Sequence, residues 1–222
     1  MDYAKMLLLL LEGLTVSAEI FALTLIFSLP LGFLVAFGRM SGNCVIRNFF
    51  RVYISVMRGT PLMLQLLMWY FGPYYLFSAN LSALSLWGIE YRFLAVIIGF
   101  ALNYAAYFGE IYRAGIQSIP VGQWEAANVL GYSRSLTFFR IVLPQVIKRV
   151  IPPVTNEVIT LVKDTSLAFS LSVLEIFTVA KQLSSASTSM IPLIAAGVFY
   201  YIFNFIVAAG MEYLEKRLDY YR

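Results

Sequence analysis

Five polar or charged side chains stand close together in an otherwise apolar stretch, residues 151–177. At 3.6 residues per helical turn they cover about one third of a helix's circumference, while Val, Ile, Leu and Phe occupy most of the rest. If this helix lies in lipid, each unpaired charge costs at least about 2.5–3.5 kcal/mol, so the charges must be paired or in contact with water. The five residues are Asn156, Glu157, Thr160, Lys163 and Asp164.

A smaller polar stripe is formed by Asn103, Tyr107 and Glu110, whose i, i+4, i+7 spacing places them on one helix face. Two polar faces in one molecule predict a shared interior cavity for a polar, zwitterionic solute. Lys163 suits the carboxylate of such a solute, and the acidic residues suit its ammonium group. The alternative is that these charges only pair with each other or with a second subunit.

The rest of the composition offers little for catalysis or metal binding. The chain has no histidine and a single cysteine, Cys44, so the commonest general base and the usual metal-ligand clusters are absent from the sequence. No G-x-x-x-x-G-K-[ST] phosphate-binding loop occurs either. We therefore predict no catalytic residue, no metal site and no cofactor bound by this chain.

The balance of apolar and charged residues predicts a membrane protein. The 222 residues are 60% hydrophobic and 13% charged, whereas a soluble domain carries about 25% charged residues. Lipid must therefore cover much of the surface. The net charge is only +4, and long apolar runs separate the basic residues from one another. This distribution favours membrane topology over a nucleic-acid partner. We expect one transmembrane domain spanning residues 1–222.

Five apolar runs approach the length of about 20 residues that a membrane-crossing helix needs. Because backbone groups in lipid must pair within their own segment, the predicted fold class is an all-α bundle of about five transmembrane helices. We expect residues 6–11 to form a short helix on the outer membrane surface and residues 142–150 to belong to a loop. The five runs are about 20–37, 52–71 (bent at Pro61), 93–112, 151–177 and 191–213.

The basic residues predict the orientation of the bundle. Twelve of the 16 Lys and Arg residues lie between the first and second runs, between the third and fourth, or after the fifth, and only three lie on the opposite side. Positive charge gathers on the cytoplasmic side, so the N-terminus is predicted outside and the C-terminus in the cytoplasm. This count includes Arg58, at the predicted cytoplasmic end of the second run.

The segment between the third and fourth runs, about 113–149, is too long for an ordinary connection. This segment contains a run of good helix formers, followed by Gly131 as a suitable helix stop. The run is Gln123-Trp124-Glu125-Ala126-Ala127. We expect a short helix held across the cytoplasmic face and presented to a partner. An ordinary amphipathic connector is the alternative.

Several motifs together resemble the polar amino-acid uptake branch of the ATP-binding-cassette importer permeases. Glu125-Ala126-Ala127, three residues, Gly131, nine residues and Ile141-Val142-Leu143-Pro144 resemble the EAA loop of those permeases. The resemblance covers residues from about 10 to 215. Its other motifs are Arg58-Gly59-Thr60-Pro61-Leu62 with Gln65, Asn103-Tyr104-Ala105-Ala106-Tyr107, Glu110-Ile111-Tyr112-Arg113, Ile119-Pro120-Val121-Gly122-Gln123-Trp124, Asn156-Glu157 and Leu161-Val162-Lys163-Asp164-Thr165-Ser166-Leu167.

The resemblance implies a set of partners and roles. Two permease subunits, identical or sister chains, would form the membrane core, with two cytoplasmic ATP-binding subunits that hold ATP and Mg and an extracytoplasmic amino-acid-binding protein. Gln123, Glu125, Ala126 and Ala127 would belong to a coupling helix that fits the ATP-binding subunit, and Gly131 would permit the turn after it. Arg58 and Pro61 would form a gate or hinge; a cytoplasmic anchor beside a proline kink is the alternative for them.

Two further functions are compatible with the residues. A secondary transporter working alone could use Glu157, Lys163 and Asp164 as a proton relay, although no repeat pair is visible in the sequence. A membrane assembly subunit could use the same stripe to hold helices together. An enzyme is disfavoured because no nucleophile–base arrangement is visible.

Overall fold

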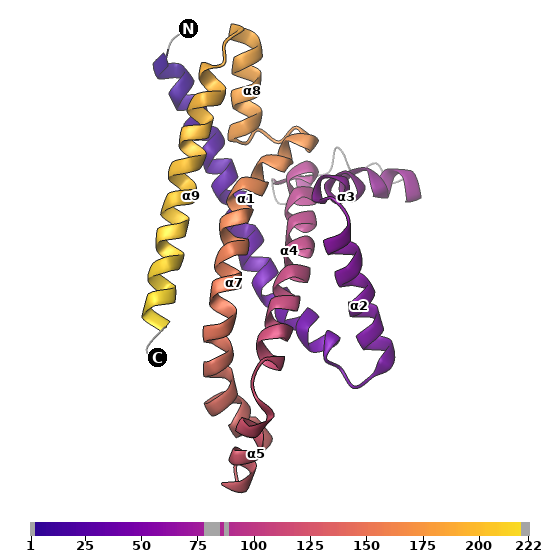
Figure 1. Cartoon of the computed structure of the whole chain (residues 1–222). Coiled ribbons are helices and arrows are strands. Elements are labelled where there is room, and N and C mark those ends of the chain that lie inside the picture. Colours follow the sequence, from indigo (N-terminus) through magenta and orange to yellow (C-terminus); the bar gives the residue numbers. More distant parts are fainter. Residues whose placement is uncertain (1–2, 78–84, 87–88, 219–222) are drawn as a thin grey trace.

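The computed structural model describes residues 3–77, 85–86 and 89–218, and these residues are almost all helical (Figure 1). Two two-residue strands, β1 (Ser85–Leu86) and β2 (Ile89–Glu90), pair antiparallel immediately before the fourth helix. The helices are α1 (Tyr3–Arg39), α2 (Cys44–Gly59), α3 (Leu62–Phe77), α4 (Tyr91–Gln117), α5 (Val121–Val129), α6 (Arg134–Thr137), the π-helix η1 (Phe138–Val142), α7 (Leu143–Asp164), the 3-10 helix η2 (Thr165–Leu171), α8 (Ile176–Ser187) and α9 (Ile191–Leu218).

The centre of the molecule is the packing of α1 against α4, the most extensive contact between two helices in the described residues. Small residues at the crossing allow the two backbones to approach. A Cβ added to Gly32 of α1 would lie 2.8 Å from Phe108 Cβ, and one added to Gly109 of α4 would lie 2.5 Å from Val35 Cγ1. Close approach of this kind stabilises helix pairs in lipid, where lipid tails leave no hydrophobic driving force between helices.

The N-terminal part of the chain differs from the prediction. Residues 6–11 were expected to form a separate helix on the outer surface, but they belong to α1, which runs without a break for 37 residues. Met6 and Leu10 are buried in a second apolar core with Ile176, Ala180 and Ala196 of α8 and α9. The packing of α1 against these two helices therefore extends it beyond the predicted span.

The second predicted span is two helices and not one bent helix. α2 ends at Gly59, α3 begins at Leu62, and α3 runs across the end of α2 (Figure 1). The prediction also placed Arg58 at the cytoplasmic end of a span beginning near residue 52. In the structure Arg58 is in the last turn of α2, 14 residues after Cys44, and therefore about 21 Å along the helix from the turn that follows α1.

The fourth predicted span has different limits and a break. Residues 142–150 were expected in a loop, but α7 begins at Leu143, directly after the π-helix η1, and Pro144 lies in its first turn. After Asp164 the helix tightens into η2, and Ser172 ends it in a left-handed conformation with φ of 56°. The helical stretch that ends at Leu171 and α8 then meet at an angle of 57°.

Three helices in the described residues are long and apolar enough to cross a membrane, namely α1, α4 and α9. The bent unit formed by residues 134–171 and α8 adds a fourth candidate. The all-helical membrane class is therefore confirmed, with three or four candidate spans.

Candidate functional site

The polar stripe of α7 is divided between two surroundings. Asn156, Thr160 and Lys163 are exposed on the single chain, whereas Glu157 and Asp164 are partly buried. The Tyr104 hydroxyl of α4 donates a 2.7 Å hydrogen bond to Asp164 Oδ2. The inner edge of the stripe is thus attached to α4, and its outer edge is open.

Arg58 joins the two predicted stripes. Its guanidinium carbon lies 5.0 Å from the centre of the Tyr107 ring, a cation–π distance. The same positive charge acts on both Glu110 of α4 and Glu157 of α7. The last turn of α2 therefore brings a cation to the place where α4 and α7 present their acidic residues.

Glu110 has a close partner in its own helix. Both of its carboxylate oxygens accept hydrogen bonds from Arg113, three residues later, and Arg113 also donates to Gln117. Since a bidentate Arg–carboxylate pair is among the stronger charged contacts, Glu110 is less available to a solute than Glu157.

Asn103 does not face the open part of the stripe. Its side chain is buried, 5% exposed, and its Nδ2 donates to the Met57 carbonyl at 2.9 Å and to Gln65 Oε1 at 3.0 Å. The helical spacing placed it correctly on the same side as Tyr107. The structure directs its amide towards the end of α2 and the beginning of α3.

The predicted coupling helix exists as α5, at the end of the molecule opposite α8 (Figure 1). Gln123, Glu125 and Ala126 are exposed, whereas Ala127 is buried and Trp124 packs against the main core. The prediction of a helix ending at Gly131 is confirmed.

Gly131 ends this helix for a conformational reason. Its φ of +77° lies in the left-handed region, which other residues rarely adopt. The Tyr132 N–H donates to the Ala127 carbonyl and the Gly131 N–H to the Asn128 carbonyl, both at 3.0 Å. This pair of bonds is the Schellman arrangement, and it makes α5 a compact unit with a defined end.

Two contacts hold the segment around α5 in place. Arg149 of α7 donates to the Ser118 carbonyl just before α5, and Gln145 Nε2 lies 3.4 Å from Gln123 Oε1. A movement applied to α5 would therefore reach the beginning of α7 directly.

One buried carboxylate was not among the predicted residues. Glu175 is 0% exposed and accepts hydrogen bonds from the Phe177 and Thr178 amides, the Thr178 hydroxyl and the Tyr200 hydroxyl, at 2.7–2.9 Å. It caps α8 and connects that helix to α9. The local sequence contains no signal for this cap, because the side chains preferred at the start of a helix are Ser, Thr, Asp and Asn.

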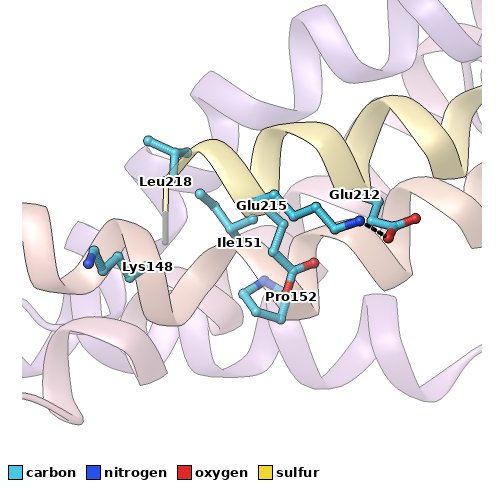
Figure 2. A pocket seen from close by; sticks show the side chains of 7 residues that line it. Lys148, Ile151, Pro152, Glu212, Glu215 and Leu218 are labelled. Carbon is cyan, nitrogen blue, oxygen red and sulfur yellow. Dashed lines mark ion pairs between the residues drawn. The ribbon is translucent and has the colours of Figure 1, made fainter. Parts of the chain in front are cut away.

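A hollow of about 470 Å³ lies between α7 and α9 (Figure 2) and contains none of the predicted site residues. Lys216 and Glu212 form an ion pair of 2.6 Å on its rim. Among the described residues no group of three or more Asp, Glu, Cys or His side chains could hold a metal ion. The hollow is lined by Lys148, Ile151, Pro152, Glu212, Glu215, Lys216 and Leu218.

Comparison with known proteins gives a consistent result along most of the chain. Residues 28–220 match the family model described as binding-protein-dependent transport system inner membrane component. The L-cystine transport system permease protein of Bacillus subtilis is 38% identical over 211 residues, which cover 94% of this chain and 86% of that protein. The nopaline transport system permease protein of Agrobacterium fabrum is 39% identical over 193 residues, 84% of this chain and 80% of that protein.

The solved structures agree with the sequence matches. A crystal structure of an amino acid ABC transporter with histidines superposes with a TM-score of 0.86 at 28% identity, covering 97% of both chains. An inward-facing methionine ABC transporter superposes with a TM-score of 0.74 at 14% identity, over 96% of this chain and 98% of that one. The second match shows a shared fold.

Proposed function

The chain belongs to the family of binding-protein-dependent transport system inner membrane components, and from that premise we propose that it is the permease subunit of an ATP-binding-cassette importer that carries a polar amino acid into the cytoplasm. Members of this family are membrane components of transport systems and not enzymes. Relatives named as permeases for cystine and nopaline support an amino-acid solute.

The observation that carries the proposal is the exposed helix α5. Gln123, Glu125 and Ala126 face outward at one end of the molecule, while Trp124 and Ala127 anchor the same helix to the body. A short helix fixed on one side can transmit force from a soluble motor to membrane helices, which a flexible loop cannot do. We propose that this surface binds a cytoplasmic ATP-binding subunit, which holds the ATP and Mg.

The route for the solute would follow the open side of α7. Tyr107, Asn156, Glu157, Thr160, Lys163 and Asp164 are the proposed solute contacts. Arg58 and Lys163 supply positive charge for a carboxylate, and Glu157 supplies negative charge for an ammonium group. Asn103 and Glu110 would support the route, because their side chains already have partners within the chain.

The exposed polar edge of α7 also supports a second permease subunit. Asn156, Thr160 and Lys163 would face lipid in a lone chain, which is costly at membrane depth. An identical or sister subunit, with a water-filled path between the two, would cover this edge. In the proposed assembly two ATP-binding subunits lie on the cytoplasmic side and an extracytoplasmic amino-acid-binding protein lies on the other.

The proposed topology keeps five crossings of the bacterial inner membrane, with α2 and α3 together forming the second. Residues 1–222 would form one permease domain, with the N-terminus outside, and the connection 113–149 and the C-terminus in the cytoplasm.

Charge reversal on α5 tests the proposal in the reconstituted complex. Glu125→Lys should abolish ATP-driven uptake while the chain still inserts and binds its second permease subunit. Glu12→Lys makes the same charge change on α1, far from α5 along the chain, and should leave ATP hydrolysis coupled to uptake. Full uptake by Glu125→Lys would contradict the coupling role.

A further inference from the structure

The break between α2 and α3 leaves the last backbone carbonyls of α2 without helical partners, and the Met57 carbonyl is one of them. In a continuous helix the Met57 carbonyl would accept a hydrogen bond from the N–H of residue 61. Residue 61 is proline, which has no N–H. A carbonyl without a partner is costly in lipid, because no water is present to replace the lost donor.

Two side-chain amides occupy the place of that donor. Asn103 Nδ2 lies 2.9 Å and Gln65 Nε2 lies 3.0 Å from the Met57 carbonyl oxygen. The two amides also bind each other, since Asn103 Nδ2 donates to Gln65 Oε1 at 3.0 Å. Both side chains are nearly inaccessible, with 5% of Asn103 and 6% of Gln65 exposed.

The same arrangement satisfies the residue at the break itself. Gln65 Nε2 lies 2.8 Å from the Thr60 hydroxyl oxygen and 3.2 Å from the Thr60 carbonyl, and the Thr60 hydroxyl donates to the Val56 carbonyl at 2.8 Å. Gln65 thus folds the first turn of α3 back onto the last turn of α2.

The contact is long-range, and a second bond supports it. Asn103 belongs to α4 and is 46 residues from Met57 along the chain. Next to it on α4, the Leu102 carbonyl accepts a 2.5 Å hydrogen bond from the Tyr53 hydroxyl, one turn earlier on α2. The last two turns of α2 are therefore attached to α4 at two consecutive points.

This attachment determines where Arg58 points. Arg58 follows Met57 directly, and Tyr107, over which its guanidinium lies, is one turn after Asn103 on α4. We propose that Asn103 and Gln65 are positioning residues that hold the proline break in one geometry and so place Arg58 over Tyr107. Arg58 thereby faces the acidic residues of the route. The transport consequence of this inference rests on the proposed function.

A double-mutant cycle in the reconstituted importer tests whether Asn103 acts through Arg58. Asn103→Leu keeps the approximate volume and removes both hydrogen bonds, and should lower the maximal uptake rate about ten- to a hundredfold. The concentration of solute-loaded binding protein that gives half-maximal uptake should change little. In an Arg58→Ala background, Asn103→Leu should cause no further loss of uptake. Losses that multiply would overturn the positioning role.

A second variant separates positioning from general stability. Pro61→Ala supplies the N–H that would let α2 continue past the break and bond the Met57 carbonyl within the helix, so it should recover the melting temperature lost in Asn103→Leu without recovering uptake. Recovery of both would overturn the inference, because any donor would then suffice.

Asn48→Leu is the matched control, since Asn48 is an exposed amide on α2, the helix that carries Arg58. It should leave the melting temperature and uptake unchanged, and a loss as large as that of Asn103→Leu would also count against the inference. ATP-dependent uptake by the unchanged complex establishes the proposed function independently, so failure of the transport proposal would be recognised before any variant is compared.

Discussion

The Tyr104 hydroxyl and Asp164 Oδ2 are 2.7 Å apart, and their hydrogen bond ties the middle of α4 to the last residue of α7. Tyr104 is 2% exposed. The bond lies where α7 passes into the 3-10 helix η2, so it fixes the point at which the regular helix ends. Removal of the hydroxyl should affect both the stability of the chain and the orientation of Asp164.

Tyr104→Phe should lower the free energy of unfolding by about 1–2 kcal/mol, the upper part of the range for hydrogen bonds between membrane helices. Thermal unfolding in detergent measures this loss. Tyr213→Phe, at an exposed tyrosine of α9, removes the same atom elsewhere and should leave the melting temperature unchanged. Equal melting temperatures for the two variants would show that the Asp164 contact adds no stability.

Gly13 allows α1 to lie directly against the beginning of α8. A Cβ at this position would lie 2.8 Å from Ile176 Cα and 2.9 Å from Ile176 N, both of which are backbone atoms that cannot easily move. Gly13→Ala should therefore destabilise the chain by about 1–3 kcal/mol.

Gly197 of α9 is the matched control, because a Cβ there would meet nothing within 4 Å. Gly197→Ala should keep or raise the melting temperature, since alanine favours a helix by up to about 1 kcal/mol over glycine. An unchanged melting temperature for Gly13→Ala would mean that α1 and α8 are farther apart than described.

Two variants at the Glu175 cap should lower the stability of the chain by different amounts. Glu175→Gln keeps the shape of the side chain but turns an NH2 group towards donors, so at least about 2 kcal/mol of stability should be lost. Tyr200→Phe removes one of the four donors and should cost about 1 kcal/mol. Unfolding in detergent measures both. A larger loss for Tyr200→Phe than for Glu175→Gln would contradict the capping role.

The proposed topology can be tested with cysteine labelling. In a Cys44→Ser background, a membrane-impermeant thiol reagent added to the outside of intact cells should label Ala186→Cys, at the end of α8. It should not label Glu125→Cys until the membrane is opened. Labelling of Glu125→Cys in intact cells would place α5 on the wrong side for any cytoplasmic motor.

The sequence predicted best the elements whose apolar runs contain no break. α4 and α9 begin within two residues of the predicted positions, although both end about five residues later. The end of α5 at Gly131 was predictable because a left-handed turn selects glycine. Asn103 and Tyr107 were correctly assigned to one helix side, because helical spacing alone determines that.

Elements that depend on distant contacts were not predictable. Hydropathy alone shows no break at Pro61, because the apolar run continues on both sides of it. The end of α2 depends instead on side-chain amides from α3 and α4. Lys148 and Arg149 suggested a loop, although the start of α7 is helical and Arg149 binds the Ser118 carbonyl. The partners of Glu175 include Tyr200, 25 residues later, which no local pattern reveals.

Uptake into proteoliposomes tests the central claim most directly. Vesicles that contain this chain, its ATP-binding subunits and enclosed ATP should accumulate a labelled amino acid only when the cognate binding protein is supplied outside. Omitting the ATP-binding subunits should abolish uptake even with a proton gradient across the membrane. Full uptake by the purified chain alone, driven by that gradient, would contradict the account and identify a secondary transporter.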